Sequence, residues 1–340
     1  MPIQYPEVSS PLRGLGPLSI RPSLALLLLL VAPLCLAEPY LEIEYYGSRQ
    51  GTDGFGTPDN DTFGDYLLVA GDDLDGFPVL AAGHTLSGSM FSATGDIHGQ
   101  AQVSMGYLRG IAAVGGGVDA SAGVLTEPFS GSLDVFVNAR FQDDTVVINA
   151  PGLAGQAGSF TARFSVDMNM LVDGFVLPEE AADPAQGAIL FADASFRLDL
   201  NDQTVRYDAW HSLDNSGGGS FNDFPEGLVL VTVPFIYGDP FRIRGRISLN
   251  ALVDANTGGF AQGRALAEFP GSFHWLGMEG LPDGATVEGV IDWSASTSTS
   301  ETEADGLGNA SGGGGAFGWL VLLALPMLLW RRIAMGAGHH

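Results

Sequence analysis

The sequence predicts an all-β protein, an antiparallel β-sandwich with a jelly-roll-like arrangement, and three observations support this. Segments 132–141, 159–167 and 241–249 alternate strictly between apolar and polar residues, which is typical of half-buried strands. Clusters of Gly, Asn, Asp and Pro, which favour turns, separate the apolar segments. No amphipathic helix of normal length is present in the body of the chain, so sheet packed on sheet is the expected architecture.

Taken in chain order, residues 1–37 have the features of an export signal peptide. Arg13 and Arg21 precede the apolar run 24–36, and Cys35-Leu36-Ala37 places small residues at the −3 and −1 positions for cleavage after Ala37. The alternative is a lipoprotein signal with an acylated Cys35, although Leu34 is unsuitable just before such a cysteine. Cys35 is the only cysteine, so the mature protein has no disulfide. Export machinery and signal peptidase are the partners that this segment predicts.

Three segments follow the signal peptide. Residues 38–293 form the predicted β-sandwich body, either as one sandwich or as two halves that divide near 182–187. Residues 294–315 are rich in Ser, Thr, Gly and acidic residues, which predicts a flexible stalk. Residues 316–340 contain an apolar segment and a basic pair, and we expect a short C-terminal membrane helix there.

The charge of the body is strongly negative. All 14 basic residues are Arg, four of which lie in the terminal segments, and 38 of the 39 acidic residues follow the signal peptide. Ten arginines therefore face 38 acidic residues, a formal charge of −28. Such a surface repels nucleic acid and anionic membranes, so no nucleic-acid partner is expected. The absence of Lys also excludes Schiff-base chemistry and the Walker phosphate-binding lysine.

The end of the chain has an unusual order of features. Gly312, Gly313, Gly314 and Gly315 precede the apolar run 316–330, which as a helix would be only ~22 Å long against the ~30 Å of a bilayer core. Pro326 weakens that helix. Arg331 and Arg332 would hold the C-terminal end in the cytoplasm. The glycines would then lie at the outer face of the membrane, where easily unwound backbone is open to a protease.

This order of glycines, short apolar helix and basic pair resembles the GlyGly-CTERM sorting signals of Gram-negative bacteria. The resemblance implies processing near Gly312–Gly315 by a rhomboid-type intramembrane protease, after transient anchoring in the inner membrane, and a final location at the cell surface or outside the cell. The alternative is a plain C-terminal anchor that is kept.

The body has a second resemblance. Tyr107-Leu108-Arg109-Gly110, residues 137–148, residues 152–166 and the block 233–241 are similar to a pattern in exported bacterial proteins of the PEP-CTERM type. The tail departs from that group because it lacks the Pro-Glu-Pro for which the signal is named. The resemblance implies an exported β-sandwich linked to the cell surface and the extracellular polysaccharide matrix, and it implies no particular reaction.

Motifs for catalysis are missing from the sequence. There is no Gly-x-Ser-x-Gly elbow and no His-Glu-x-x-His pair. The four histidines of the body, His84, His98, His211 and His274, have no metal-ligand spacing. Acidic residues are so numerous that pairs such as Glu179-Glu180 do not indicate a glycosidase dyad. We therefore expect a non-catalytic protein without a cofactor, with a secreted glycan-active enzyme as an alternative.

Two acidic loops are candidates for calcium, because carboxylate oxygens are the ligands that Ca²⁺ prefers. The first contains Asp59 and Asp61, and the second contains Asp72, Asp73 and Asp75. Neither matches an EF-hand loop, and the alternative is that they are acidic turns of an acidic protein.

A binding surface is the last candidate. Arg242, Arg244 and Arg246 share one face of the segment 241–249, where they would either grip the carboxylates of an acidic polysaccharide or pair with acidic residues on a neighbouring strand. Trp210, Trp275 and Tyr237 would either form a platform for sugar stacking or pack inside the sandwich. The expected function is thus structural or matrix-associated, with a carbohydrate-binding module as the first alternative.

Overall fold

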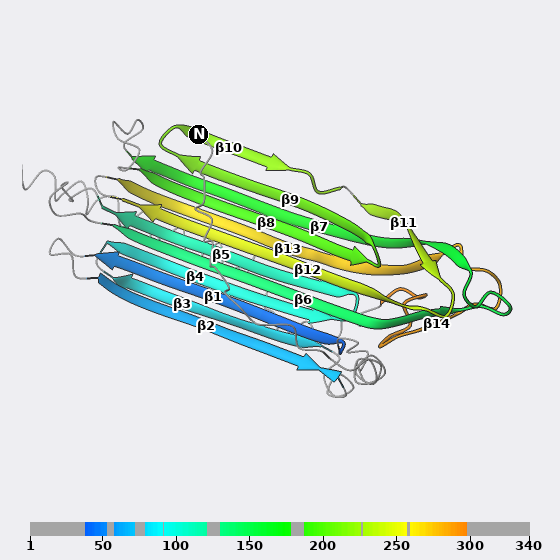
Figure 1. Cartoon of the computed structure of the whole chain (residues 1–340). Coiled ribbons are helices and arrows are strands. Elements are labelled where there is room, and N and C mark those ends of the chain that lie inside the picture. The colour runs from blue at the N-terminus through cyan, green and yellow to red at the C-terminus, as the bar shows by residue number, and fades with distance from the viewer. Residues whose placement is uncertain are drawn as a thin grey trace, which may run out of the picture. The chain divides into compact units, whose positions relative to one another are not determined.

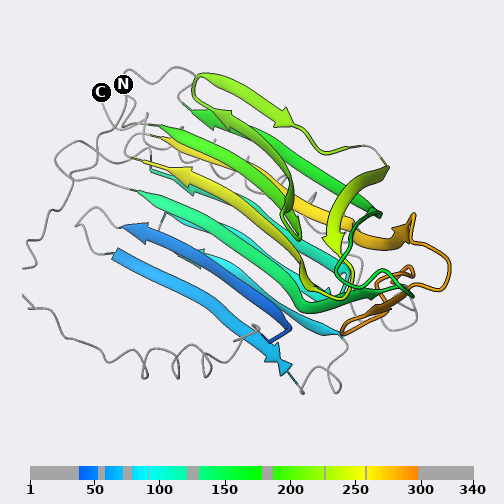
Figure 2. The same ribbon diagram turned by 45° about the vertical axis from the view of Figure 1, so that its right-hand side comes forward.

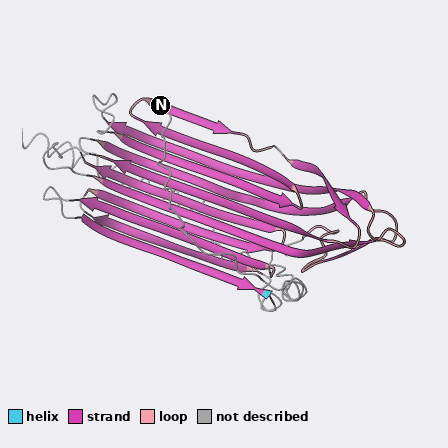
Figure 3. Ribbon diagram, viewed as in Figure 1, coloured by secondary structure: helices cyan, strands magenta, loops and turns pink. Residues whose placement is uncertain are grey.

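The computed structural model describes residues 38–52, 58–71, 79–90, 92–120, 130–177, 187–225, 227–256 and 259–297. Within these ranges the regular structure consists of β-strands, apart from a short helical turn at Gly71, and includes no α-helix (Figure 3), so the prediction of an all-β fold is confirmed. The strands are β1 (Tyr40–Thr52), β2 (Pro58–Ala70), β3 (Leu80–Met90), β4 (Ala93–Ser104), β5 (Tyr107–Asp119), β6 (Gly131–Asn149), β7 (Ala157–Leu177), β8 (Ala188–Leu200), β9 (Gln203–Asp214), β10 (Gly217–Asn222), β11 (Leu228–Ile236), β12 (Pro240–Ala255), β13 (Phe260–Glu279) and β14 (Thr286–Glu288).

The strands form two antiparallel sheets that pack face to face (Figures 1 and 2). Sheet A has the order β10-β9-β8-β12-β6-β1-β2, with β14 paired to the far end of β6. Sheet B has the order β11-β7-β13-β5-β4-β3. Every strand pair is antiparallel, as the alternating sequence pattern predicts for sheets with one buried face. The described residues of the body therefore form a β-sandwich.

Strands from both halves of the body are mixed within each sheet. In sheet A, β12 lies between β6 and β8, and in sheet B, β13 lies between β5 and β7. The compact unit that these strands form ends at Ser296. Because central strands of both sheets come from the second half of the body and pair with strands of the first, residues on either side of 182–187 share one sandwich.

The three alternating segments all have the predicted buried face. Every second residue of β12 from Phe241 to Ala255 is buried, and the residues between them are half-buried or exposed. In β6 the buried set includes Leu133, Val135 and Val137, and in β7 it includes Phe160 and Phe164. Fully burying an apolar side chain of this size stabilises the fold by about 1.5–3 kcal/mol, so this alternation determines which face of each strand is in the core.

Aromatic rings join the two sheets at the centre of the sandwich. Phe273 of β13 contacts Phe141, Phe164 and Phe196, with ring centroids 5.8, 5.6 and 5.2 Å away. Gly245 of β12 makes room for this cluster, because a Cβ there would lie 2.5 Å from a ring carbon of Phe141. The buried cluster fixes the inward face of β12 and so directs the residues on either side of Gly245 outward.

Candidate functional site

The outer face of sheet A collects most of the arginines of the body. Arg242, Arg244 and Arg246 alternate along β12 with the buried Ile243 and Gly245, so the prediction that they share one face is confirmed. The same face also carries Arg140 of β6, Arg197 of β8 and Arg206 of β9. Six of the ten arginines of the body thus lie on one face of one sheet.

Four of these arginines form a row across the strands. Arg246 is the register partner of Arg140 on one side and of Arg197 on the other, and Arg197 is in turn the partner of Arg206. Neighbouring strands lie ~4.8 Å apart, so the four side chains occupy consecutive positions on adjacent strands. We call Arg140, Arg246, Arg197 and Arg206 the arginine row. Like charges directly opposite one another destabilise a sheet unless nearby opposite charges offset them, so the partners of each arginine matter.

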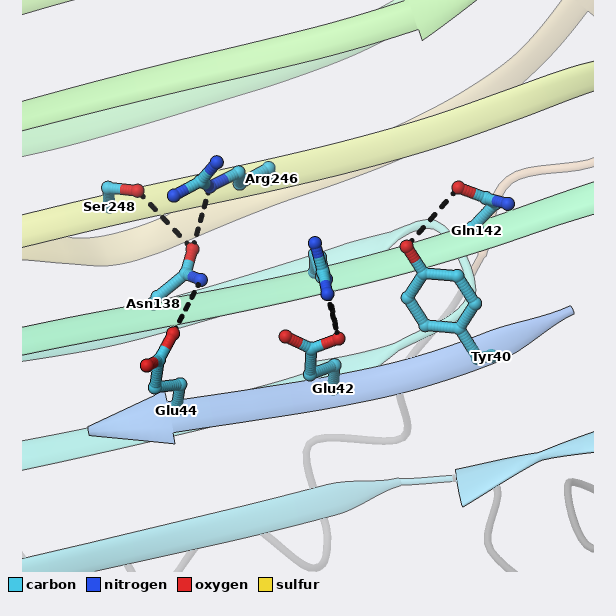
Figure 4. Close-up of polar contacts among 8 residues, drawn as sticks. Tyr40, Glu42, Glu44, Asn138, Gln142, Arg246 and Ser248 are labelled. Atoms are coloured by element: carbon cyan, nitrogen blue, oxygen red, sulfur yellow. Dashed lines mark hydrogen bonds and ion pairs between the residues drawn. The ribbon is translucent and has the colours of Figure 1, made fainter. Parts of the chain in front are cut away.

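The row begins at β6 with a buried ion pair. The Nε of Arg140 donates to the Oε2 of Glu42 at 2.6 Å, and its Nη2 contacts the same oxygen. The Glu42 side chain is only 4% exposed, whereas that of Arg140 is 26% exposed. The guanidinium also lies 5.3 Å from the centre of the Tyr40 ring, whose hydroxyl donates to Gln142 (Figure 4). Arg140 is therefore both a member of the row and the counter-ion of a buried carboxylate.

The next member, Arg246, has an amide as its partner instead of a carboxylate. Its Nε donates to the Oδ1 of Asn138 at 2.8 Å, and Asn138 contacts Ser248 and Glu44 (Figure 4). Burial lowers the pKa of Arg246, and the positive charges of Arg140 and Arg244 add to this effect. Glu44 and Glu42 act in the opposite direction, so the guanidinium of Arg246 has charges of both signs around it and a neutral hydrogen-bond partner.

The two outer members pair with aspartates of their own strands. Arg197 donates through Nε to Asp199 at 2.9 Å, and Arg206 contacts both oxygens of Asp208, at 2.8 and 3.0 Å. Their side chains are 57% and 67% exposed. Pairs this open contribute little to stability, and their arginines remain accessible from solvent.

The other two arginines of β12 differ from each other. Arg242 donates to Asp144 of β6, so the alternative of cross-strand pairing with a carboxylate is correct for this residue. Arg244 lies between Gln142 and Asp199 in the register, and among the described residues no carboxylate comes within ion-pair distance of it. Of these two arginines of β12, therefore, Arg242 is paired with a carboxylate and Arg244 is not.

The predicted aromatic platform does not form. Trp210 lies on the outer face of sheet A, 39% exposed, opposite Phe221 of β10, which is 47% exposed. Trp275 is fully buried, and its Nε1 donates to the carbonyl of Trp293. Tyr237 is also buried. The prediction of a shared platform is wrong, because two of its three rings are in the core, and the exposed aromatic pair is Trp210 with Phe221.

Three aspartates lie farther along the same face. Asp134, Asp193 and Asp254 sit on the outer sides of β6, β8 and β12. Burial raises the pKa of Asp254 to about 6, and the charge of Asp134 adds to it. Burial also raises the pKa of Asp134 and of Asp193. The outer face of sheet A therefore has arginines paired with carboxylates at the arginine row, and aspartates without an arginine partner toward the other end of these strands.

The C-terminal part of the body is fastened to the sandwich by a buried carboxylate. Asp143 of β6 is fully buried and accepts hydrogen bonds from Trp293 Nε1 at 2.8 Å and from the backbone of Val290 at 2.9 Å. The Trp293 ring packs edge-on against Trp275, with centroids 5.4 Å apart. We call Asp143, Trp275, Val290 and Trp293 the clasp. It has no exposed polar group, so its role is structural.

The structure describes only some of the residues that were predicted to bind calcium. The carboxylate of Asp61 accepts from Nη2 of Arg49 at 2.7 Å, and Arg49 is buried with its Nε and Nη1 unpartnered. Asp72, Asp73, Asp75 and the side chain of Asp59 lie outside the described residues. In the described part of the chain no three His, Cys, Asp or Glu side chains group as metal ligands. Calcium binding at 72–75 stays a prediction.

The two sorting signals fall outside the described residues. This applies to Ala37, to Gly312–Gly315 and to Arg331 and Arg332, and also to Glu179-Glu180. Among the residues that are described, no helix has the length and apolar character to cross a membrane.

Three members of the row, Arg140, Arg197 and Arg206, were not among the binding residues predicted from the sequence. The alternation within 132–141 places Arg140 on the polar face of its strand, which is a usable signal. The register that brings the four side chains together cannot be read from one strand. Comparison of the chain with protein-family models, with curated proteins and with solved structures finds no match.

Proposed function

We propose that this is an exported, non-catalytic surface protein that holds polyanionic matrix material on the outer face of sheet A. The observation that carries the proposal is the arginine row. A body with a formal charge of −28 places six of its ten arginines on one face and sets four of them side by side. Three of the four are paired with a carboxylate, whereas Arg246 has an amide as its partner, so its charge is the one that an anionic ligand would neutralise.

The contacts of the row favour binding over catalysis. Glu42, Asp199 and Asp208 each accept hydrogen bonds from an arginine of the row, and Glu44, which also acts on Arg246, accepts from Asn138. A paired carboxylate is a poor general base or acid, because the neighbouring guanidinium stabilises its charged form. The alternative of a glycan-active enzyme would need a pair of carboxylates that face one sugar.

Carbohydrate recognition by stacking is a second candidate function, and Trp210 with Phe221 favours it. Both rings are exposed, on neighbouring strands and on the same face as the arginine row. Exposed aromatic rings of this kind offer apolar faces to sugar rings. We also propose that the two sheets of this sandwich have a jelly-roll-like strand order.

The export part of the proposal is supported by the sequence signals. Signal peptidase would act after Ala37, and a rhomboid-type protease would act near Gly312–Gly315, at the junction of the glycines and the short apolar segment. Mass spectrometry of the C-terminal peptide from surface and medium fractions tests this. Processing predicts a mature protein without Trp319–Arg332, whereas an intact Arg331-Arg332 end would mean that the tail is a retained anchor.

Binding is tested with the mature exported protein on immobilised polymers. We expect retention on an acidic polysaccharide that falls as sodium chloride rises, because screening weakens contacts between exposed charges. A neutral glucan of similar length is the matched control and should retain little. Equal retention on both polymers at every salt concentration would contradict a polyanion-binding function and would favour stacking on Trp210 and Phe221.

A further inference from the structure

We propose that the ligand of sheet A is a polyuronate chain that lies across the strands, with its carboxylates in register with the arginine row. This inference rests on the proposed function and names the ligand class and its direction. The arginine row crosses β6, β12, β8 and β9. Arg242, Arg244 and Arg246, in contrast, follow one another along the single strand β12.

The spacing of the row suits a polymer with one carboxylate on each sugar. Adjacent strands lie ~4.8 Å apart, so the four guanidinium groups repeat at about that interval. The planar guanidinium of arginine binds a carboxylate through two parallel hydrogen bonds. A polyuronate carries a carboxylate on every sugar, so along the row it offers more carboxylates than a polymer with a carboxylate on every second sugar, which would leave more of the arginines without a partner.

The arginines of the row retain donors for such a ligand. Arg246 uses its Nε for Asn138, and Arg197 uses its Nε for Asp199. Within the described residues neither arginine has an acceptor for its two Nη groups. Arg206 uses Nε and Nη2 for Asp208, and Arg140 uses the same two nitrogens for Glu42 and also interacts with Tyr66. Arg246 and Arg197 are thus the members with both terminal nitrogens available.

Negative charge on both sides of the row limits the width of the ligand. Asp199 and Asp208 flank the row on opposite sides, and Asp193 and Asp254 lie farther along the face. A single polysaccharide chain that follows the row stays over positive charge. A DNA duplex has one charge per ~1.7 Å and would extend over these aspartates, so it is disfavoured.

The test is titration calorimetry of the mature protein with an oligouronate long enough to span four strands. Arg197→Gln/Arg206→Gln removes the outer half of the row, and we expect affinity to fall by about tenfold or more, since hydrogen bonds to charged groups each contribute about 1.5–3 kcal/mol. Arg163→Gln/Arg264→Gln removes the same charge from sheet B and should change affinity less than about twofold. An oligomer with alternate uronate and neutral sugars should bind more weakly than the full oligouronate.

The possible outcomes separate the inference from the proposed function. If Arg242→Gln/Arg244→Gln weakens binding and Arg197→Gln/Arg206→Gln does not, the ligand runs along β12, and the direction proposed here is wrong while polyanion binding stands. If the alternating oligomer binds as well as the oligouronate, the assignment of one carboxylate to each arginine is wrong. If duplex DNA binds more tightly, the ligand class is wrong. If no polyanion binds, the proposed function fails as well.

Discussion

Arg140 and Arg246 are neighbours in the arginine row, yet their side chains have different partners. Arg140 neutralises Glu42, a carboxylate that is 4% exposed, so its removal leaves a buried charge without a partner. Arg246 pairs with the neutral Asn138 and lies between two other arginines. The first residue is required for stability, and the second is available for a ligand.

Replacement of Arg140 should therefore cost stability. We expect Arg140→Gln to lower the free energy of unfolding by about 2 kcal/mol, which is less than the 3–5 kcal/mol of a fully buried pair because Arg140 is partly exposed. Arg246→Gln is the control and should be neutral or slightly stabilising, since it removes two like-charge contacts. Urea unfolding of the two variants measures this, and equal losses would contradict the distinction.

Asp254 gives the fold a pH dependence of known sign. Its pKa is raised to about 6 from 3.8, so the folded state binds the proton more tightly, and stability contributed by the protonated form is lost as the pH rises from about 4 to 6. Asp254→Asn should then raise the melting temperature at pH 8, by an amount equivalent to about 1–2 kcal/mol after allowance for solvent screening.

The gain from Asp254→Asn should have largely disappeared at pH 4, because the folded wild type then carries the proton and the unfolded state carries it in part. Asp239→Asn, at an exposed position, controls for the general benefit of removing negative charge. A gain at pH 8 that matches the control, or one that persists at pH 4, would show that Asp254 is not strained by burial.

At the scale of elements, the clasp fastens the segment after β14 to β6. Trp293→Phe keeps an aromatic ring and removes the hydrogen bond to Asp143, whose carboxylate is buried. We expect a loss of about 1.5–3 kcal/mol, the usual value for a hydrogen bond to a charged group. Trp210→Phe is the matched control on the exposed face and should change stability by less than about 0.5 kcal/mol. Chemical denaturation of both variants decides whether the clasp stabilises the body.

The strands and their buried faces could be predicted because alternation is a local property. The period of two in 132–141, 159–167 and 241–249 depends only on neighbouring residues, and it placed Arg242, Arg244 and Arg246 on one outer face. The register is a property of distant segments. Arg246 and its partner Asn138 are 108 positions apart in the chain, and no local pattern specifies that contact.

The prediction of an aromatic platform also depended on contacts between distant segments. Trp275 lies two residues after the buried Phe273 and shares its parity, so it points inward. The irregularities of β13 at Glu268/Ser272 and Trp275/Gly277 lie on either side of these two residues, so their parity does not carry over from the rest of the strand. The residue type alone did not separate a stacking ring from a core ring. The polar partner that holds Trp275 in place, the carbonyl of Trp293, comes from another part of the chain.

At the scale of the whole molecule, the charge of the body is the dominant property. A formal charge of −28 destabilises a compact state through self-repulsion, and salt screens that repulsion. We expect the melting temperature to rise between low and moderate sodium chloride concentrations. Thermal melts across a salt series measure this, and a constant melting temperature would mean that the acidic residues are too dispersed to repel one another.

Salt should thus act in opposite directions on stability and on ligand binding. The same screening that relieves repulsion within the body weakens the attraction between the arginine row and a polyanion. This contrast distinguishes loss of binding from loss of fold, because the protein should be more stable under the conditions in which it binds less.

The central claim is that the arginine row of sheet A is a binding site for an acidic polysaccharide. The most direct measurement is the affinity of the mature protein for a polyuronate, compared with the variant Arg197→Gln/Arg206→Gln/Arg246→Gln, which keeps the Arg140–Glu42 pair. We predict that the wild type binds, that the triple variant loses binding, and that their melting temperatures agree within a few degrees. Equal affinity of the two proteins would contradict the claim.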